Sequence, residues 1–134
     1  MVSLSALLAL SSCAVFSTDP GSNAGTGFIE TTWNLAYLGP NFVKVHRDPL
    51  VSPAYSKVLD RFPATYINCG GRDALLPQSF RFAKCLVDAG VETTVSIVGP
   101  GDHEFLLGPD YVPGATEELD RMIDWMRLQD QVAG

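Results

Sequence analysis

The second half of this sequence alternates β-rich runs with amphipathic runs, and this order restricts the possible folds more than any other feature. Residues 64–69 and 93–98 are rich in β-branched and apolar side chains, which predicts two strands. Between them, Pro77 suits the first turn of a helix and Gly90 suits its C-terminal cap. The predicted apolar stripe of this helix comprises Phe80, Ala83, Leu86 and Val87. A helix between two such strands is typical of a parallel pair with a crossover connection.

A further helix is predicted near the end of the chain, over residues 116–128. Its apolar side chains share one face: Leu119, Met122, Ile123 and Met126. Acidic side chains in its first turns favour the positive N-terminal end of the helix: Glu117, Glu118 and Asp120. The second half therefore reads as strand, helix, strand, helix.

The first half continues the same order with weaker signals. Residues 7–16 form a near-continuous apolar run, which predicts a strand covered on both faces. Helices are predicted over residues 29–38, ending at Gly39–Pro40, and over residues 54–61. The whole chain therefore predicts an α/β fold in which about three parallel strands alternate with helices.

Composition limits the class of partner and cofactor. The 134 residues fit one domain, and 46% hydrophobic residues argue against a disordered chain. A net charge of −6, with scattered Lys and Arg, argues against a nucleic-acid partner. The cysteines, Cys13, Cys69 and Cys85, have no metal-ligand spacing, and their odd number does not suggest a disulfide framework. We expect no metal, no cofactor and a cytoplasmic setting, with Cys69 and Cys85 as small buried groups.

The N-terminus admits two interpretations. Residues 2–10 are apolar and lead into Leu10-Ser11-Ser12-Cys13, which superficially fits a bacterial lipoprotein cleavage site. However, no Lys or Arg precedes this run, although signal peptides normally begin with a positive region. The run is also too short to span a bilayer. A buried strand is the favoured interpretation, and a secreted lipoprotein anchored at Cys13 is the alternative.

An acid and a histidine follow the two predicted strands of the second half. Asp73 comes after Gly70-Gly71, and His103 comes after Gly101-Asp102. Because the carboxyl ends of parallel strands meet at one edge of a sheet, both side chains are predicted near that edge. A carboxylate that accepts the Nδ1–H of an imidazole fixes its tautomer, as in a catalytic triad. Asp102 is the alternative acid, but adjacent residues in a tight turn seldom reach each other well, so Asp73 is favoured.

Several motifs together resemble one protein family. They are the Asp48-to-Pro53 run, the turn from Gly70 to Leu75, Asp88-Ala89-Gly90-Val91, and Gly101-Asp102-His103-Glu104-Phe105. In order and spacing they resemble the C-terminal part of α/β-hydrolases of the hormone-sensitive-lipase (fold-3) esterase group. The dienelactone-hydrolase branch shares the last two motifs, and the Asp48-to-Pro53 run favours the esterase branch. The resemblance implies that Asp73 is the triad acid, that His103 is the general base, and that the intact relatives act on small-molecule esters.

The chain departs from this family at three points. The nucleophile elbow Gly-x-Ser-x-Gly is absent, and the nearest match, Gly21-Ser22-Asn23-Ala24-Gly25, has asparagine at its centre. A His-Gly-Gly-Gly oxyanion loop is also absent. Glu104 follows His103 where the family often has glycine, although Phe105 keeps its place. Without a nucleophile and oxyanion donors, nearly all the rate enhancement of such a site would be lost.

These observations predict a single partial domain over residues 1–134, the C-terminal part of an α/β-hydrolase domain. We expect a fragment of a serine-type carboxylic-ester hydrolase that carries the triad acid and histidine and is inactive alone. The alternative is a non-catalytic binding or interaction module derived from the same fold. The apolar run at residues 7–16 would leave an unpaired strand edge, which predicts self-association.

Overall fold

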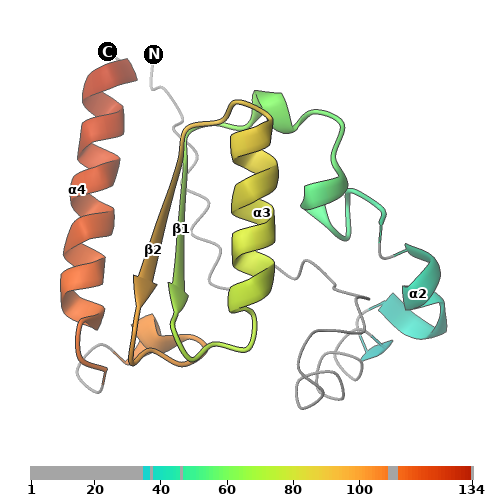
Figure 1. Ribbon diagram of the computed structural model, residues 1–134, viewed down its shortest axis with the longest axis horizontal. Coiled ribbons are helices and arrows are strands. Elements are labelled where there is room, and N and C mark those ends of the chain that lie inside the picture. The colour runs from blue at the N-terminus through green and yellow to red at the C-terminus, as the bar shows by residue number, and fades with distance from the viewer. Residues whose placement is uncertain (1–34, 37, 46, 109–111, 134) are drawn as a thin grey trace.

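Two parallel strands and the helices on either side of them form the centre of the fold. The computed structural model describes residues 35–36, 38–45, 47–108 and 112–133. Strand β1 (Thr65–Gly70) pairs in parallel with β2 (Thr93–Val98), in an unbroken register from Thr65 opposite Thr93 to Gly70 opposite Val98. Helix α3 (Leu76–Asp88) covers one face of the pair and α4 (Ala115–Ala133) covers the other (Figure 1). The predicted α/β class and the two strands predicted in the second half of the sequence are confirmed.

Helix α3 follows its predicted ends closely, whereas α4 is longer than predicted. Pro77 lies in the first turn of α3, and Gly90, just after the end of the helix, has φ +82°, a conformation that suits glycine. Helix α4 begins at Ala115 and continues to Ala133, beyond the predicted end at residue 128. No Gly or Pro interrupts residues 115–133, so nothing in the sequence ends the helix earlier.

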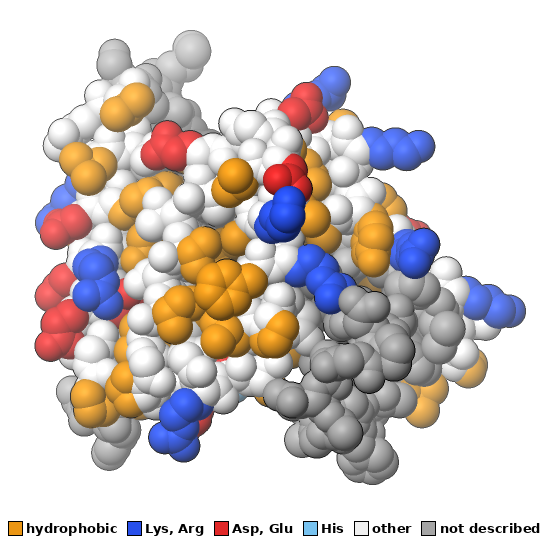
Figure 2. Space-filling model, viewed as in Figure 1, with side chains coloured by type: hydrophobic (Ala, Val, Ile, Leu, Met, Phe, Trp, Pro, Cys, Tyr) orange, Lys and Arg blue, Asp and Glu red, His pale blue; other side chains and the backbone are white. Residues whose placement is uncertain are grey.

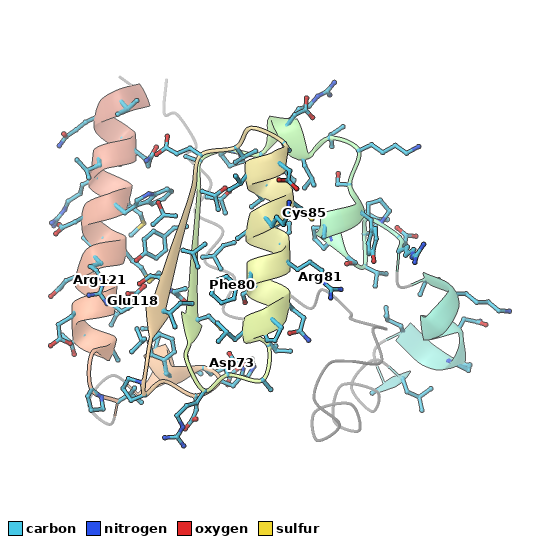
Figure 3. The ribbon with its side chains drawn as sticks, viewed as in Figure 1. Asp73, Phe80, Arg81, Cys85, Glu118 and Arg121 are labelled. Carbon is cyan, nitrogen blue, oxygen red and sulfur yellow. The ribbon has the colours of Figure 1, made fainter. Side chains whose placement is uncertain are left out.

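The predicted apolar stripe of α3 is partly wrong. Ala83 and Leu86 are buried as expected, whereas Phe80 is 50% exposed and Val87 is 58% exposed. The buried face runs instead through Ser79, Phe82, Ala83 and Leu86, at the spacing i, i+3, i+4, i+7. Figure 2 shows apolar side chains at the surface near the middle of the face viewed in Figure 1. Figure 3 labels Phe80 beside α3, in the same part of the view.

The single helix predicted over residues 54–61 is also wrong. Two short 3₁₀ helices stand there, Pro53–Tyr55 and Leu59–Arg61. Ser56 leaves the helical conformation with ψ 138°, and its Oγ accepts the N–H of Val58 at 3.3 Å. A serine side chain that bonds its own neighbouring backbone competes with helix continuation in this way.

Residues 39–45 are helical, which the sequence analysis did not predict. A 3₁₀ turn (Gly39–Asn41) leads into the one-turn helix α2 (Phe42–Val45). The strand predicted at residues 7–16, most of the helix predicted at residues 29–38, Cys13 and the Gly21-to-Gly25 segment lie outside the described residues. None of the helices in the described ranges has the length and apolar content needed to cross a membrane.

The two faces of the strand pair are packed differently. The face toward α3 holds an apolar cluster formed by Leu59, Ile67, Phe82, Ala83, Leu86 and Val91. The opposite face holds a polar layer that we call the α4-side layer, formed by Tyr66, Ser96, Glu118 and Arg121. Tyr66 and Ile67 are adjacent in β1 and point to opposite faces, as the period of two in a strand requires.

Candidate active site

The loops that follow β1 and β2 lie against each other at the carboxyl end of the strands. The backbone N–H of Gly71 donates to the carbonyl of Val98 at 2.7 Å, and that of Arg72 donates to the carbonyl of Gly101 at 3.0 Å. These bonds extend the strand pairing into the loops. The segments that carry Asp73 and His103 are therefore fixed relative to each other by backbone contacts.

Glycine is required where the two loops meet. A Cβ on Gly70 would lie 2.2 Å from the carbonyl oxygen of Gly101, and a Cβ on Gly71 would lie 2.7 Å from that of Gly99. Both distances are shorter than real Cβ contacts, and the atoms met are backbone atoms that cannot rotate away. The Gly70-Gly71 pair thus permits the close approach on which the site depends.

Asp73 lies at this junction with both carboxylate oxygens engaged. Oδ1 accepts the backbone N–H of Leu75 at 2.8 Å, and Oδ2 lies 3.1 Å from Nδ1 of His103. The Asp73 side chain is 3% exposed and that of His103 is 45% exposed, so the pair joins a buried acid to a ring that reaches the surface. Figure 3 places Asp73 where β1 and α3 are connected. The structure therefore brings together the two residues that the topology predicted to be close.

Asp102, the alternative acid, has a different partner. Its Oδ1 lies 3.2 Å from Nε of Arg72, and both of these side chains are about two-thirds exposed. The ion pair joins the two loops at the surface, where such pairs contribute little to stability. Among the described residues, the acid that contacts His103 is Asp73.

Glu104 adopts the left-handed conformation, with φ 58° and ψ 26°. Among the described residues it is the one non-glycine residue with positive φ. This conformation is costly for a residue with a Cβ and free of that cost for glycine. The observation gives a physical reason for the glycine that the family often has here. The next residue, Phe105, is buried against Val98 and Ala115 and anchors the loop.

Cys69 is a residue of this site that the sequence analysis treated only as a small buried group. Its Sγ lies 3.7 Å from Oδ2 of Asp73, within the longer range of sulfur hydrogen bonds. The signal that could have found it is its position in β1, at the carboxyl end and close before Asp73.

The Asp48-to-Pro53 run forms a turn. The Asp48 carboxylate accepts the N–H of Leu50 at 2.9 Å, and its carbonyl accepts the N–H groups of Val51 and Ser52. Ser52 is fully buried at the start of the following 3₁₀ helix. In the described part of the chain, no three His, Cys, Asp or Glu side chains gather in a way that could hold a metal ion.

Comparison with known proteins places the chain in a family. A family model described as an alpha/beta hydrolase fold matches residues 8–107. No curated protein sequence matches the chain. Solved structures do match. Carboxyl esterase 2 from the mycorrhizal fungus Tuber melanosporum has 22% identity and a TM-score of 0.60, with 71% of this chain and 32% of that chain covered.

Two further structures match over similar stretches. Vibralactone cyclase has 20% identity and a TM-score of 0.64, with 77% of this chain and 29% of that chain covered. Brefeldin A esterase, a bacterial homologue of human hormone sensitive lipase, has 21% identity and a TM-score of 0.58, with 73% of this chain and 28% of that chain covered.

This chain thus spans about a third of the length of these structures, and at such identities they support the fold alone. The family assignment rests on the family model, which covers most of the sequence. The expected resemblance to fold-3 hydrolases is confirmed, and the chain belongs to the alpha/beta hydrolase fold-3 family.

Proposed function

We propose that this chain supplies the acid and the histidine of a serine-type carboxylic-ester hydrolase. The observation that carries the proposal is the 3.1 Å contact between Nδ1 of His103 and Oδ2 of Asp73, at the carboxyl ends of two parallel strands. That edge is where ligands bind in open α/β sheets. The names of the matched esterases agree with this class of reaction and do not by themselves assign it.

Each residue has a defined role in the proposed reaction. His103 takes the proton of a serine hydroxyl through Nε2 as the serine attacks the acyl carbonyl, and then gives that proton to the leaving alcohol. The Asp73 carboxylate accepts Nδ1–H, which leaves Nε2 free to act as the base. It also stabilises the imidazolium that forms while the proton resides on His103.

The nucleophile is assigned to a segment other than these 134 residues. The sequence contains no Gly-x-Ser-x-Gly elbow and no His-Gly-Gly-Gly loop. We therefore propose that the chain alone does not hydrolyse esters, and that a serine and oxyanion donors must complete the site. The substrate class is a small-molecule carboxylic ester.

The test begins with sequencing of the native transcript upstream of Met1. An in-frame elbow and oxyanion loop would define a longer chain, which would then be expressed with and without His103→Ala and assayed on p-nitrophenyl butyrate. We expect hydrolysis by the longer chain and a loss of about 10³-fold or more in kcat in the His103→Ala variant. Asp102→Asn, which changes the neighbouring acid, serves as the matched control and should stay within a few-fold of wild type.

Two results would contradict the proposal. The first is hydrolysis by the longer chain that His103→Ala leaves unchanged. The second is a native transcript that starts at Met1, in which case the non-catalytic binding module becomes the better description. His103-dependent turnover by the 134 residues alone would instead show that a nucleophile within them had been overlooked.

A further inference from the structure

Cys69 is a buried thiol that the proposed mechanism does not use. It lies one residue before the end of β1 and is 2% exposed. Ile67, two residues earlier, packs in the apolar cluster beneath α3, so the strand period places Cys69 on that same side. The thiol therefore stands between the apolar cluster and the loop that carries Asp73.

The Asp73 carboxylate is held by groups from three different segments. Leu75, just before α3, donates its N–H to Oδ1. His103, in the loop after β2, contacts Oδ2. Cys69 in β1 donates its S–H to the same Oδ2, across 3.7 Å. A carboxylate oxygen has two lone pairs and can accept both bonds. Of these groups, Cys69 alone belongs to a strand.

The thiol is a donor at neutral pH. Burial raises the pKa of Cys69, a hydrogen bond with Ser79 lowers it, and the negative charge of Asp73 raises it, with a raised pKa as the net result. A thiol that keeps its proton can donate S–H to a carboxylate. It is a poor nucleophile, because the thiolate is the reactive form.

We propose that Cys69 is a positioning residue for the acid, and that its S–H···Oδ2 bond holds the Asp73 carboxylate in the rotamer that faces Nδ1 of His103. The effect of Cys69 on catalysis rests on the proposed function. The effect of Cys69 on the His103 tautomer does not, because the tautomer depends only on the contact between Asp73 and His103. The two proposals can therefore fail separately.

The test measures the His103 tautomer by long-range proton–nitrogen correlation spectra of the imidazole ring. The chain has two histidines, so a His103→Ala spectrum assigns the signals. We expect wild type to favour Nδ1–H and Cys69→Ala to shift the tautomer ratio toward Nε2–H by roughly two- to tenfold, the loss of one hydrogen bond. Cys69→Ser restores a donor and should return the ratio toward wild type. Cys85→Ala, a cysteine change on α3, is the matched control and should not alter it.

Two results would overturn the role of Cys69 without affecting the proposed function. One is a Cys69→Ala ratio equal to wild type while Asp73→Asn shifts it. The other is a shift that Cys69→Ser reproduces in full, which would indicate packing rather than donation. If Asp73→Asn leaves the ratio unchanged, Asp73 does not orient the ring and the proposed function fails as well. If the tautomer responds as expected and the serine-bearing longer chain shows no ester hydrolysis, the proposed function fails and the positioning role stands.

A measurement on the wild-type thiol keeps the test independent of whether Cys69→Ala folds. The infrared difference spectrum between wild type and Cys69→Ser isolates the S–H stretching band of Cys69. A hydrogen bond to a carboxylate should place this band at lower frequency than that of Cys85, isolated with Cys85→Ser. Asp73→Asn, which weakens the acceptor, should move the band upward. A Cys69 band at the frequency of a thiol without a hydrogen bond would overturn the proposal.

Discussion

The two faces of the strand pair are stabilised by different interactions, apolar packing on one face and buried hydrogen bonds on the other. Toward α3, Ile67, Phe82 and Leu86 are fully buried in an apolar cluster. Toward α4, the fully buried carboxylate of Glu118 accepts hydrogen bonds from Tyr66 at 2.9 Å and Ser96 at 2.6 Å. The first face depends on apolar area removed from water, and the second depends on the hydrogen bonds that join Glu118 to Tyr66 and Ser96.

The two faces are expected to respond differently to substitution. An apolar contact is non-directional, so its loss scales with the atoms removed and the cavity left. A buried carboxylate and its donors depend on one another, because the loss of one member leaves the others unsatisfied in a place that water does not reach. The α3 side should therefore respond in a graded way, and the α4-side layer should respond as a unit.

The largest expected effect is on the apolar face. Phe82→Ala removes a ring that is fully buried and that packs edge-on against Phe62, with ring centroids 6.1 Å apart. We expect the free energy of unfolding to fall by about 4 kcal/mol, measured by urea denaturation. Phe82→Leu should cost markedly less, because most of the volume is kept. Equal losses for the two variants would contradict a graded response.

The α4-side layer provides the second prediction. Glu118→Leu leaves the buried hydroxyl group of Tyr66 and the half-buried hydroxyl group of Ser96 without their acceptor, and we expect a loss of about 3 kcal/mol in the free energy of unfolding. Adding Tyr66→Phe and Ser96→Ala to Glu118→Leu should recover most of this loss, since no orphaned hydroxyl then remains. Losses that simply add across the three changes would show that the layer is not a unit.

The third prediction concerns the junction between the loops after β1 and β2, where backbone atoms of Gly70 and Gly101 meet. Gly70→Ala places a methyl group 2.2 Å from the backbone oxygen of Gly101, so the loops must separate. We expect a loss of about 2 kcal/mol in unfolding free energy and a weaker Asp73–His103 contact, read from the His103 tautomer. Gly99→Ala is the matched control, because its Cβ would meet nothing within 4 Å. It should change stability by under about 0.5 kcal/mol. A Gly70→Ala variant as stable as Gly99→Ala would contradict this prediction, because it would show that the two loops can separate at no cost in stability.

The sequence predicted the parts of the site that depend on topology. Asp73 and His103 follow successive parallel strands, and parallel strands bring their carboxyl ends to one edge whatever their side chains are. Thr65–Gly70 and Thr93–Val98 were therefore enough to place both residues together. The contact between Cys69 and Asp73 could not be predicted from the sequence, because it depends on the side-chain rotamers of these two residues.

The role of Glu118 could not be predicted for a related reason. From the sequence it is one of several acidic residues in the first turns of a helix, where the helix dipole explains it well enough. In the structure Glu118 is fully buried. It accepts hydrogen bonds from Tyr66 and Ser96, which lie 52 and 22 positions away in the sequence. Phe80 shows the same limit, since the helical pattern alone allowed two neighbouring faces of α3. Long-range packing selected between them.

The α4-side layer should also respond to alkaline pH. Burial, followed by weaker effects that include the Glu118 charge, raises the pKa of Tyr66 above its usual value of 10.0. The folded state therefore keeps the Tyr66 proton at a pH where the unfolded chain has lost it. Stability from this group is complete below pH 10 and falls as the pH rises through the folded pKa. In thermal melts between pH 9 and 11.5, Tyr66→Phe should show a shallower loss of Tm than wild type. Parallel curves would mean that the phenol is not held neutral by the fold.

The smallest expected effect lies in the loop that holds His103, away from both packed faces. Glu104→Gly relieves the cost of φ 58° for a residue with a Cβ, but it also gives the unfolded chain more conformations to lose. The two terms oppose each other, and we expect a net gain of about 0.5 kcal/mol in unfolding free energy. Glu104→Gln keeps the strain and removes only the charge, so it should match wild type. If Glu104→Gln stabilises the protein as much as Glu104→Gly, the native residue destabilises the fold through its charge beside His103 and not through its backbone conformation.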